Sequence, residues 1–217
     1  MIVPSDSNET NSLVHMGNRT SIKEFWSWFV AHRIDVDVLT DSDSPFWDVV
    51  LDELKKIDEH LWFEMSRPNG NDREFIVTAE GHKELFPVVD QMVSLAPHIE
   101  GWQFFALIPS RGFDFEMTYE GLTFAPCSMW FLPLESRSRP QEFGIRVGIP
   151  NYNTAIERQA KHAVLIILDN GLGERSSSID VQFVDIAPLP EDPDFEGYLE
   201  LTELPRYIEW RKRTRPT

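Results

Sequence analysis

The chain has 217 residues, 41% of them hydrophobic, with 15 Phe and 7 Trp; this excludes wholesale disorder, because such side chains require burial. Asp and Glu number 36 against 20 Lys and Arg, and the net charge of −16 disfavours nucleic acid and anionic membranes and attracts basic partners, although solubility alone is the favoured explanation of this acidity. The single cysteine, Cys127, excludes an internal disulfide and a four-cysteine zinc site. Because no signal segment or membrane-length apolar run is evident, we expect a cytoplasmic protein.

Two helices are predicted near the start of the chain. Residues 1–19 are polar and aperiodic, so we expect a flexible arm there. Ser21 and Glu24 form a capping box that predicts the start of a helix. Its apolar face comprises Ile22, Phe25, Trp26, Phe29 and Val30. Ser44-Pro45 predicts the start of a second helix that reaches about His60. Its inward residues are Trp47, Val50, Leu51, Leu54 and Ile57.

Residues 61–108 predict a β-hairpin, a helix and a strand. The hairpin strands are 61–65 and 75–79, separated by a polar break. Helical spacing follows over 83–96, and 102–108 is an almost unbroken apolar strand. The residues of this stretch that stand out are expected to form a core.

The second half predicts further strands and one long helix. The expected elements are strands 113–119, 129–132, 143–149 and 179–186, with a turn at Gly121, and a helix over 153–169 that Gly171-Leu-Gly-Glu174 ends. A Pro-rich acidic segment begins at residue 188, and residues 205–213 predict a short helix with a basic end.

This order predicts an α+β fold with a mainly antiparallel sheet and helices packed on one face. An elaborated ferredoxin-like core is the preferred topology. We expect a single domain over 20–187, preceded by the arm 1–19 and followed by the acidic Pro-rich tail 188–217 with its short C-terminal helix.

Several short motifs resemble a family of uncharacterised bacterial proteins that share a domain of unknown function, over roughly residues 22–186. The motifs are Phe25-Trp-Ser-Trp-Phe29, Ala79-Glu-Gly81 with Leu85-Phe-Pro-Val88, Ala96-Pro97, Gly101-Trp102 and Leu168-Asp-Asn-Gly-Leu-Gly-Glu174. They are mostly aromatic, Gly and Pro positions, so the resemblance implies a shared fold and transfers no functional residues.

The candidate catalytic residues are few. His82 lies at a predicted strand-to-helix junction. A metal site would need a second ligand four residues later, but that position is Phe86, so no metal site is predicted. The favoured role of His82 is that of a surface or capping residue. Glu116 and Glu120 project from the polar face of a predicted strand and would require desolvation for acid–base work. Cys127 lacks a nucleophile signature and is expected to be at least half-buried. No cofactor is predicted.

The aromatic residues suggest an interface instead. Trp26 and Trp28 are two residues apart on a helix, so Trp28 is expected to be partly exposed; Trp62 and Trp130 could lie on the second faces of their strands. The competing interpretation, which is favoured, is that helices cover those faces. The leading hypothesis is a soluble, non-catalytic protein-binding module, immunity- or antitoxin-like, with Trp28, Trp62 and Trp130 at a surface for a basic partner. The alternatives are a hydrolase using His82, Glu116 and Glu120, and a small-ligand-binding protein with a site beside the sheet.

Overall fold

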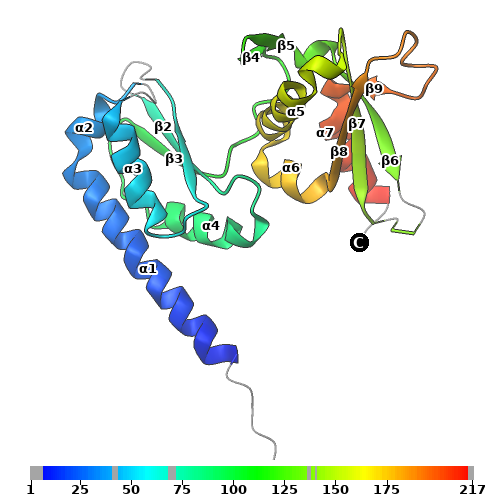
Figure 1. The fold of residues 1–217 in the computed structure, drawn as a ribbon. Helices are drawn as coiled ribbons and strands as arrows, with labels where there is room; N and C mark the ends of the chain where they lie inside the picture. Colours follow the sequence, from blue (N-terminus) through cyan, green and yellow to red (C-terminus); the bar gives the residue numbers. More distant parts are fainter. Residues whose placement is uncertain (1–6, 41–43, 68–71, 136–137, 140, 215–217) are drawn as a thin grey trace, which may run out of the picture. The chain divides into compact units, whose positions relative to one another are not determined.

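The chain divides into two compact units, 1–108 and 109–217, where the sequence predicted a single domain and a tail. The structure, a computed structural model, describes residues 7–40, 44–67, 72–135, 138–139 and 141–214, and only the backbone for 7–18. Both units combine helices with small sheets (Figure 1), so the predicted α+β class is confirmed.

In the first unit, three helices precede the sheet along the chain, and a fourth connects its second and third strands. Its elements are α1 (Ser7–Ala31), α2 (Arg33–Asp37), α3 (Pro45–Lys55), β1 (Trp62–Met65), β2 (Arg73–Thr78), a 3-10 turn (Lys83–Leu85), α4 (Phe86–Ser94) and β3 (Trp102–Ala106). The predicted hairpin is confirmed, because β1 and β2 pair antiparallel. Beyond α4, β3 pairs parallel with β2, so the sheet is mixed.

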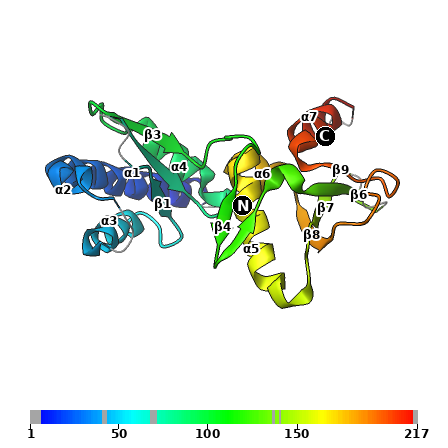
Figure 2. The same ribbon diagram turned by 90° about the horizontal axis from the view of Figure 1, so that it is seen from above.

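Helices cover one face of this sheet through aromatic contacts. Phe63 and Phe75 stack at 5.2 Å between ring centroids. Trp47 of α3 lies 4.3 Å from Phe63, and Phe29 of α1 lies 5.3 Å from Phe75. The indole N–H of Trp26 donates to the carbonyl of Met92 in α4 at 2.8 Å. Helices packed on one face, as the sequence predicted, are therefore found in this unit (Figure 2).

The second unit begins with a small hairpin and ends with a helix. Its elements are β4 (Met117–Tyr119), β5 (Leu122–Phe124), a 3-10 turn (Pro126–Ser128), β6 (Trp130–Glu135), β7 (Phe143–Ile149), a 3-10 turn (Thr154–Ile156), α5 (Glu157–Leu172), α6 (Glu174–Asp180), β8 (Phe183–Pro188), β9 (Leu199–Glu200), a 3-10 turn (Leu201–Glu203) and α7 (Leu204–Thr214). The larger sheet has the order β8-β7-β6-β9. Buried side chains of β6, β7, α5 and α7 form one core beneath it.

The two units repeat one topology. In each, two antiparallel strands are followed by a helical crossover and a third strand parallel to the second, giving β1-β2-α4-β3 and β6-β7-α5-β8. A Phe–Val pair also occurs near the start of both hairpins, since Phe63 opposes Val77 and Phe131 opposes Val147. The sequence carries a trace of this repeat. Trp62-Phe63 precedes Glu74-Phe75 at the same spacing at which Trp130-Phe131 precedes Glu142-Phe143.

Several predictions about the sheet and the termini are wrong. The described strands form three sheets, two of which contain parallel pairs, instead of one mainly antiparallel sheet, and they show no ferredoxin-like core. Parallel neighbours arise because the connections from β2 to β3 and from β7 to β8 are long and helical. The tail is not separate, because Leu201, Leu204 and Ile208 are buried in the core of the second unit. Of the strand expected over 113–119, only β4 forms.

The first helix differs from its prediction as well. Residues 7–19, expected to be a flexible arm, belong to α1, and residues 1–6 lie outside the described part. Ser21 and Glu24 therefore lie inside the helix and do not start it. No proline interrupts the chain between Pro4 and Pro45, so helical hydrogen bonding can propagate towards the N-terminus. The predicted apolar face is confirmed except at Val30, which is exposed.

Candidate functional site

Two histidines with carboxylate partners lie close together in the first unit. The rings of His60 and His82 lie 4.7 Å apart. Nδ1 of His60 lies 3.2 Å from Asp58 Oδ1, and Nδ1 of His82 lies 3.2 Å from Glu84 Oε1. The sequence analysis placed His82 at a strand-to-helix junction, which is confirmed, but it missed His60, because the two are brought together only by the hairpin register.

The pKa of Glu84 is lowered, first by a backbone hydrogen bond at Glu84 itself and then by the hydrogen bond from His82. Its ionised form is therefore favoured in the folded chain. The associated stabilisation is present above the ordinary Glu range and is lost as pH falls through the lowered pKa. We expect His82→Gln to shift the Glu84 titration partway back upward in a carboxyl ¹³C NMR titration. An unchanged Glu84 curve in that variant would show that the imidazole does not contact the carboxylate.

The other two candidate catalytic residues, Glu116 and Glu120, lie in the second unit. Glu120 accepts two hydrogen bonds from the Arg158 guanidinium, at 2.6 and 3.1 Å, and this ion pair raises the pKa of Arg158. Glu116 is exposed just before β4. Glu120 and Gly121 have positive φ and make the predicted turn between β4 and β5. The nearby His162 Nδ1 lies 3.1 Å from the Tyr119 hydroxyl.

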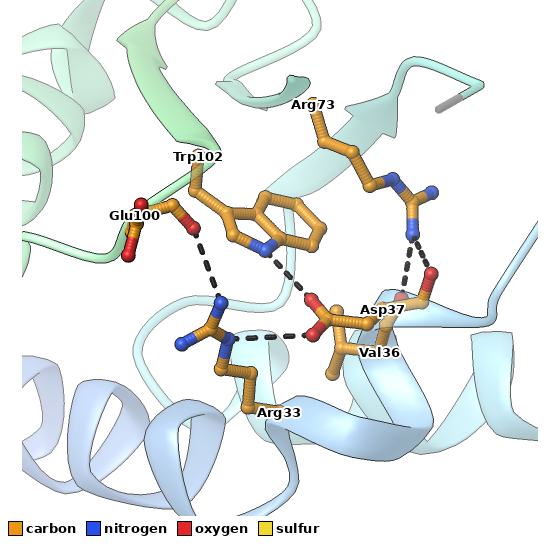
Figure 3. Close-up of polar contacts among 6 residues, drawn as sticks. All are labelled: Arg33, Val36, Asp37, Arg73, Glu100 and Trp102. Atoms are coloured by element: carbon orange, nitrogen blue, oxygen red, sulfur yellow. Dashed lines mark hydrogen bonds and ion pairs between the residues drawn. The ribbon is translucent and has the colours of Figure 1, made fainter. Parts of the chain in front are cut away.

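The buried Arg73, at the start of β2, binds several backbone carbonyls of the first unit. The Arg73 guanidinium donates to the carbonyls of Val36 at 2.7 Å and Asp37 at 2.9 Å, where α2 ends (Figure 3). It also donates to the Leu39 and Ser66 carbonyls and lies 4.9 Å from the Trp102 ring centroid. The pKa of Arg73 is lowered, because burial disfavours the charged form more than the nearby charge of Asp37 favours it. A guanidinium nevertheless remains charged at neutral pH. Arg73 thus caps the C-terminus of α2 from β2.

Asp37, the last residue of α2, completes this network. Its Oδ1 accepts from the Trp102 indole at 2.8 Å, and its Oδ2 pairs with Arg33 Nε at 3.3 Å (Figure 3). Arg33 in turn donates to the Glu100 carbonyl at 3.1 Å. These contacts fix α2 to both parallel strands of the sheet, so the outward face of α2 is held in a defined orientation.

Three exposed apolar residues lie in α2 and on either side of it. Val30, Ile34 and Val38 are 49%, 81% and 72% exposed, and we call them the apolar stripe. Helical hydrogen bonding continues from α1 into α2 through His32, whose N–H donates to Trp28 and whose carbonyl accepts from the Val36 N–H. The three residues follow one another at intervals of four across the junction of α1 and α2, with Val38 directly after α2. Pattern analysis missed the stripe, since it assigned Val30 to the core.

The three predicted interface tryptophans are all half-buried. Trp28 is more exposed than Trp26, as predicted, but it stacks on His32 at 4.7 Å and on Phe46 at 6.0 Å. Trp62 packs against the core of the first unit beneath Lys55. Trp130 alternates with the buried Phe131, so it lies on the sheet face opposite that core residue.

Two cavities lie within the described part of the second unit. One, of about 310 Å³, lies at the C-terminal end of β7; its lining, Leu122, Thr123, Phe124, Ala125, Ser128, Met129, Ile149, Pro150, Asn151, Asn153 and Ile156, contains no charged residue. The other, of about 340 Å³, lies beside β8 and includes Leu134, Phe183 and the charged Arg139 and Glu142. Both are at the lower end of the volumes typical of small-ligand sites.

Three further observations on the described chain concern its cysteine, its potential metal ligands and its helices. Cys127 is exposed on a 3-10 turn, so the prediction of an at least half-buried thiol is wrong. Within the described ranges, no three His, Cys, Asp or Glu side chains are grouped as metal ligands. No helix in this part of the chain is both long and apolar enough to cross a membrane.

Comparison with protein-family models, curated proteins and solved structures finds no match to this chain. The resemblance to a bacterial family noted from the motifs therefore stays a prediction.

Proposed function

We propose that this chain is a soluble, non-catalytic protein-binding module whose partner presents a basic surface, in the manner of an immunity protein or antitoxin. The observation that carries the proposal is the apolar stripe of Val30, Ile34 and Val38. Side chains this exposed gain from burial in a complex, and contiguous exposed apolar residues mark interaction sites.

Charge selects the kind of partner. Residues 1–108 contain 19 Asp and Glu against 8 Lys and Arg, a balance of −11, so most of the excess negative charge lies in the unit that carries the stripe. Asp35 on α2 and Asp48 and Asp52 on α3 are exposed, whereas Arg33 is paired with Asp37. An acidic surface around apolar contacts favours a basic partner through steering and complementary pairing.

The Arg73 and Asp37 contacts support this role, because they hold α2 before any partner arrives. A surface ordered in advance loses less conformational entropy on binding. The predicted aromatic anchors are replaced in this proposal: Trp28 and Trp62 pack within their own unit, and the aliphatic stripe supplies the apolar contact.

The test is a pull-down from native lysate with the full chain at about 50 and 300 mM salt, followed by binding measurements on any stoichiometric partner. We expect one basic partner, retained better at low salt because surface charges are screened less. Replacing Ile34 and Val38 together with Gln should weaken its binding at least tenfold, the typical effect of losing more than about 1.4 kcal/mol of interface contacts.

The matched control is Leu165→Gln with Ile166→Gln, which alters two exposed apolar residues of α5 in the second unit. This control should leave binding unchanged. An acidic partner, equal loss in both double variants, or no retained protein from a folded sample would each contradict the proposal.

The alternatives have less support. The hydrolase hypothesis needs His82 together with Glu116 and Glu120, yet these residues belong to different compact units and Glu120 is paired with Arg158. The small-ligand alternative is supported by the uncharged cavity at the end of β7, and a thermal shift with neutral metabolites would favour it.

A further inference from the structure

We propose that His60 and His82 bind a single divalent transition-metal ion of the zinc, nickel or copper type. This site is independent of the apolar stripe and of the proposed protein partner. Imidazole nitrogen is a preferred ligand of these metals, whereas calcium and magnesium prefer oxygen ligands.

The carboxylates determine which nitrogens are free to bind. Asp58 and Glu84 each lie 3.2 Å from the Nδ1 atom of their histidine. An ionised carboxylate only accepts hydrogen bonds, so each Nδ1 must carry the proton when its ring is neutral. The lone pair of each ring is then on Nε2. A carboxylate on one ring nitrogen with the metal on the other is the usual arrangement around metal-binding histidines, and it increases the basicity of the ligating nitrogen.

The backbone brings the two histidines to the same end of the sheet. Trp62 pairs with Thr78, so His60 precedes β1 at the end where β2 leads into His82. Glu80 and Gly81, between β2 and His82, both have positive φ, at 48° and 83°. A non-glycine residue in this conformation is costly and is concentrated at functional sites. This end is also the carboxyl end of a parallel strand pair, the usual place for ligands in sheets with helical crossovers.

The protein supplies two ligands, and the remaining positions would be filled by water, because Asp58 and Glu84 lie at the other ring nitrogens and the described chain has no group of three or more His, Cys, Asp or Glu that could hold a metal ion. The side chains of His60 and His82 are 51% and 42% exposed, so an ion can enter directly. The complex should therefore be reversible and should weaken on acidification, since protonated imidazoles do not bind metal.

The experiment titrates the full metal-free chain with ZnCl₂ and, separately, with NiCl₂ by isothermal calorimetry at pH 7.5 and pH 5.5. We expect one ion per chain at pH 7.5 and at least tenfold weaker binding at pH 5.5. His60→Gln and His82→Gln should each weaken binding at least tenfold. Glu84→Gln should weaken it by about ten- to a hundredfold, the typical effect of losing the carboxylate behind a ligating histidine.

The matched control is His98→Gln, which removes another exposed histidine of the same unit and should leave binding unchanged. Circular dichroism verifies that each variant is folded. MgCl₂ should give no saturable heat. Absence of saturable zinc and nickel binding, or equal loss in His98→Gln, would overturn the site.

Discussion

Replacing Arg73 with alanine is expected to destabilise the first unit by about 3–5 kcal/mol, the typical cost of removing one partner from a buried charged network. The substitution leaves the carbonyls of Val36, Asp37, Leu39 and Ser66 without the guanidinium that joins them. It also removes the positive charge from the C-terminus of α2. Urea unfolding followed by tryptophan fluorescence measures the loss, since five of the seven tryptophans precede residue 109.

Two further variants test this explanation. Arg73→Lys keeps the charge, but a single ammonium group cannot reproduce the planar fork that reaches several carbonyls, so it should recover only part of the stability. Arg33→Ala removes an exposed arginine from the same network and should cost about 1 kcal/mol or less. If Arg73→Ala and Arg33→Ala cost the same, burial of Arg73 is not what stabilises α2.

Gly171→Ala is expected to destabilise the second unit by about 1–3 kcal/mol, the usual range for an overpacked core. On helical propensity alone, the change in α5 would stabilise by roughly 1 kcal/mol. The structure reverses the sign, because a methyl group at Gly171 would overlap the ring of the buried Phe113. Urea unfolding followed by circular dichroism measures the difference in the free energy of unfolding.

The double variant separates steric overlap from other causes. Phe113→Ala alone creates a cavity and should cost about 3–5 kcal/mol. In that background Gly171→Ala has room for its methyl group, so it should be neutral or stabilising. The expected coupling between the two substitutions is therefore at least 1 kcal/mol. Purely additive effects would show that the ring does not restrict position 171.

The candidate sites show where sequence patterns stop being informative. His82 could be placed at a strand-to-helix junction from local signals alone. Its partner His60 could not be found, because ligand spacing along one helix says nothing about residues joined by a hairpin register. The apolar stripe was missed for a related reason: Val30 fits the inward periodicity of α1, yet no neighbouring element covers it.

Several of the local elements, and most of their buried faces, follow from the sequence by itself. Ser44 caps α3 by accepting from the Phe46 N–H at 3.4 Å, and β7 spans the predicted residues 143–149, because capping and alternation are local consequences of residue type. Gly173, with φ of 83°, ends α5 close to the predicted stop.

Tertiary structure alone decided how these elements are grouped. Two parallel strand pairs, each joined by a helical crossover, produce two cores and one repeated topology where local patterns predicted one mainly antiparallel sheet. Strand partners are chosen by contacts between distant residues, and the free energy of those contacts is not encoded in any short segment. The same long-range pairing brings His60 to His82 and Arg73 to the end of α2.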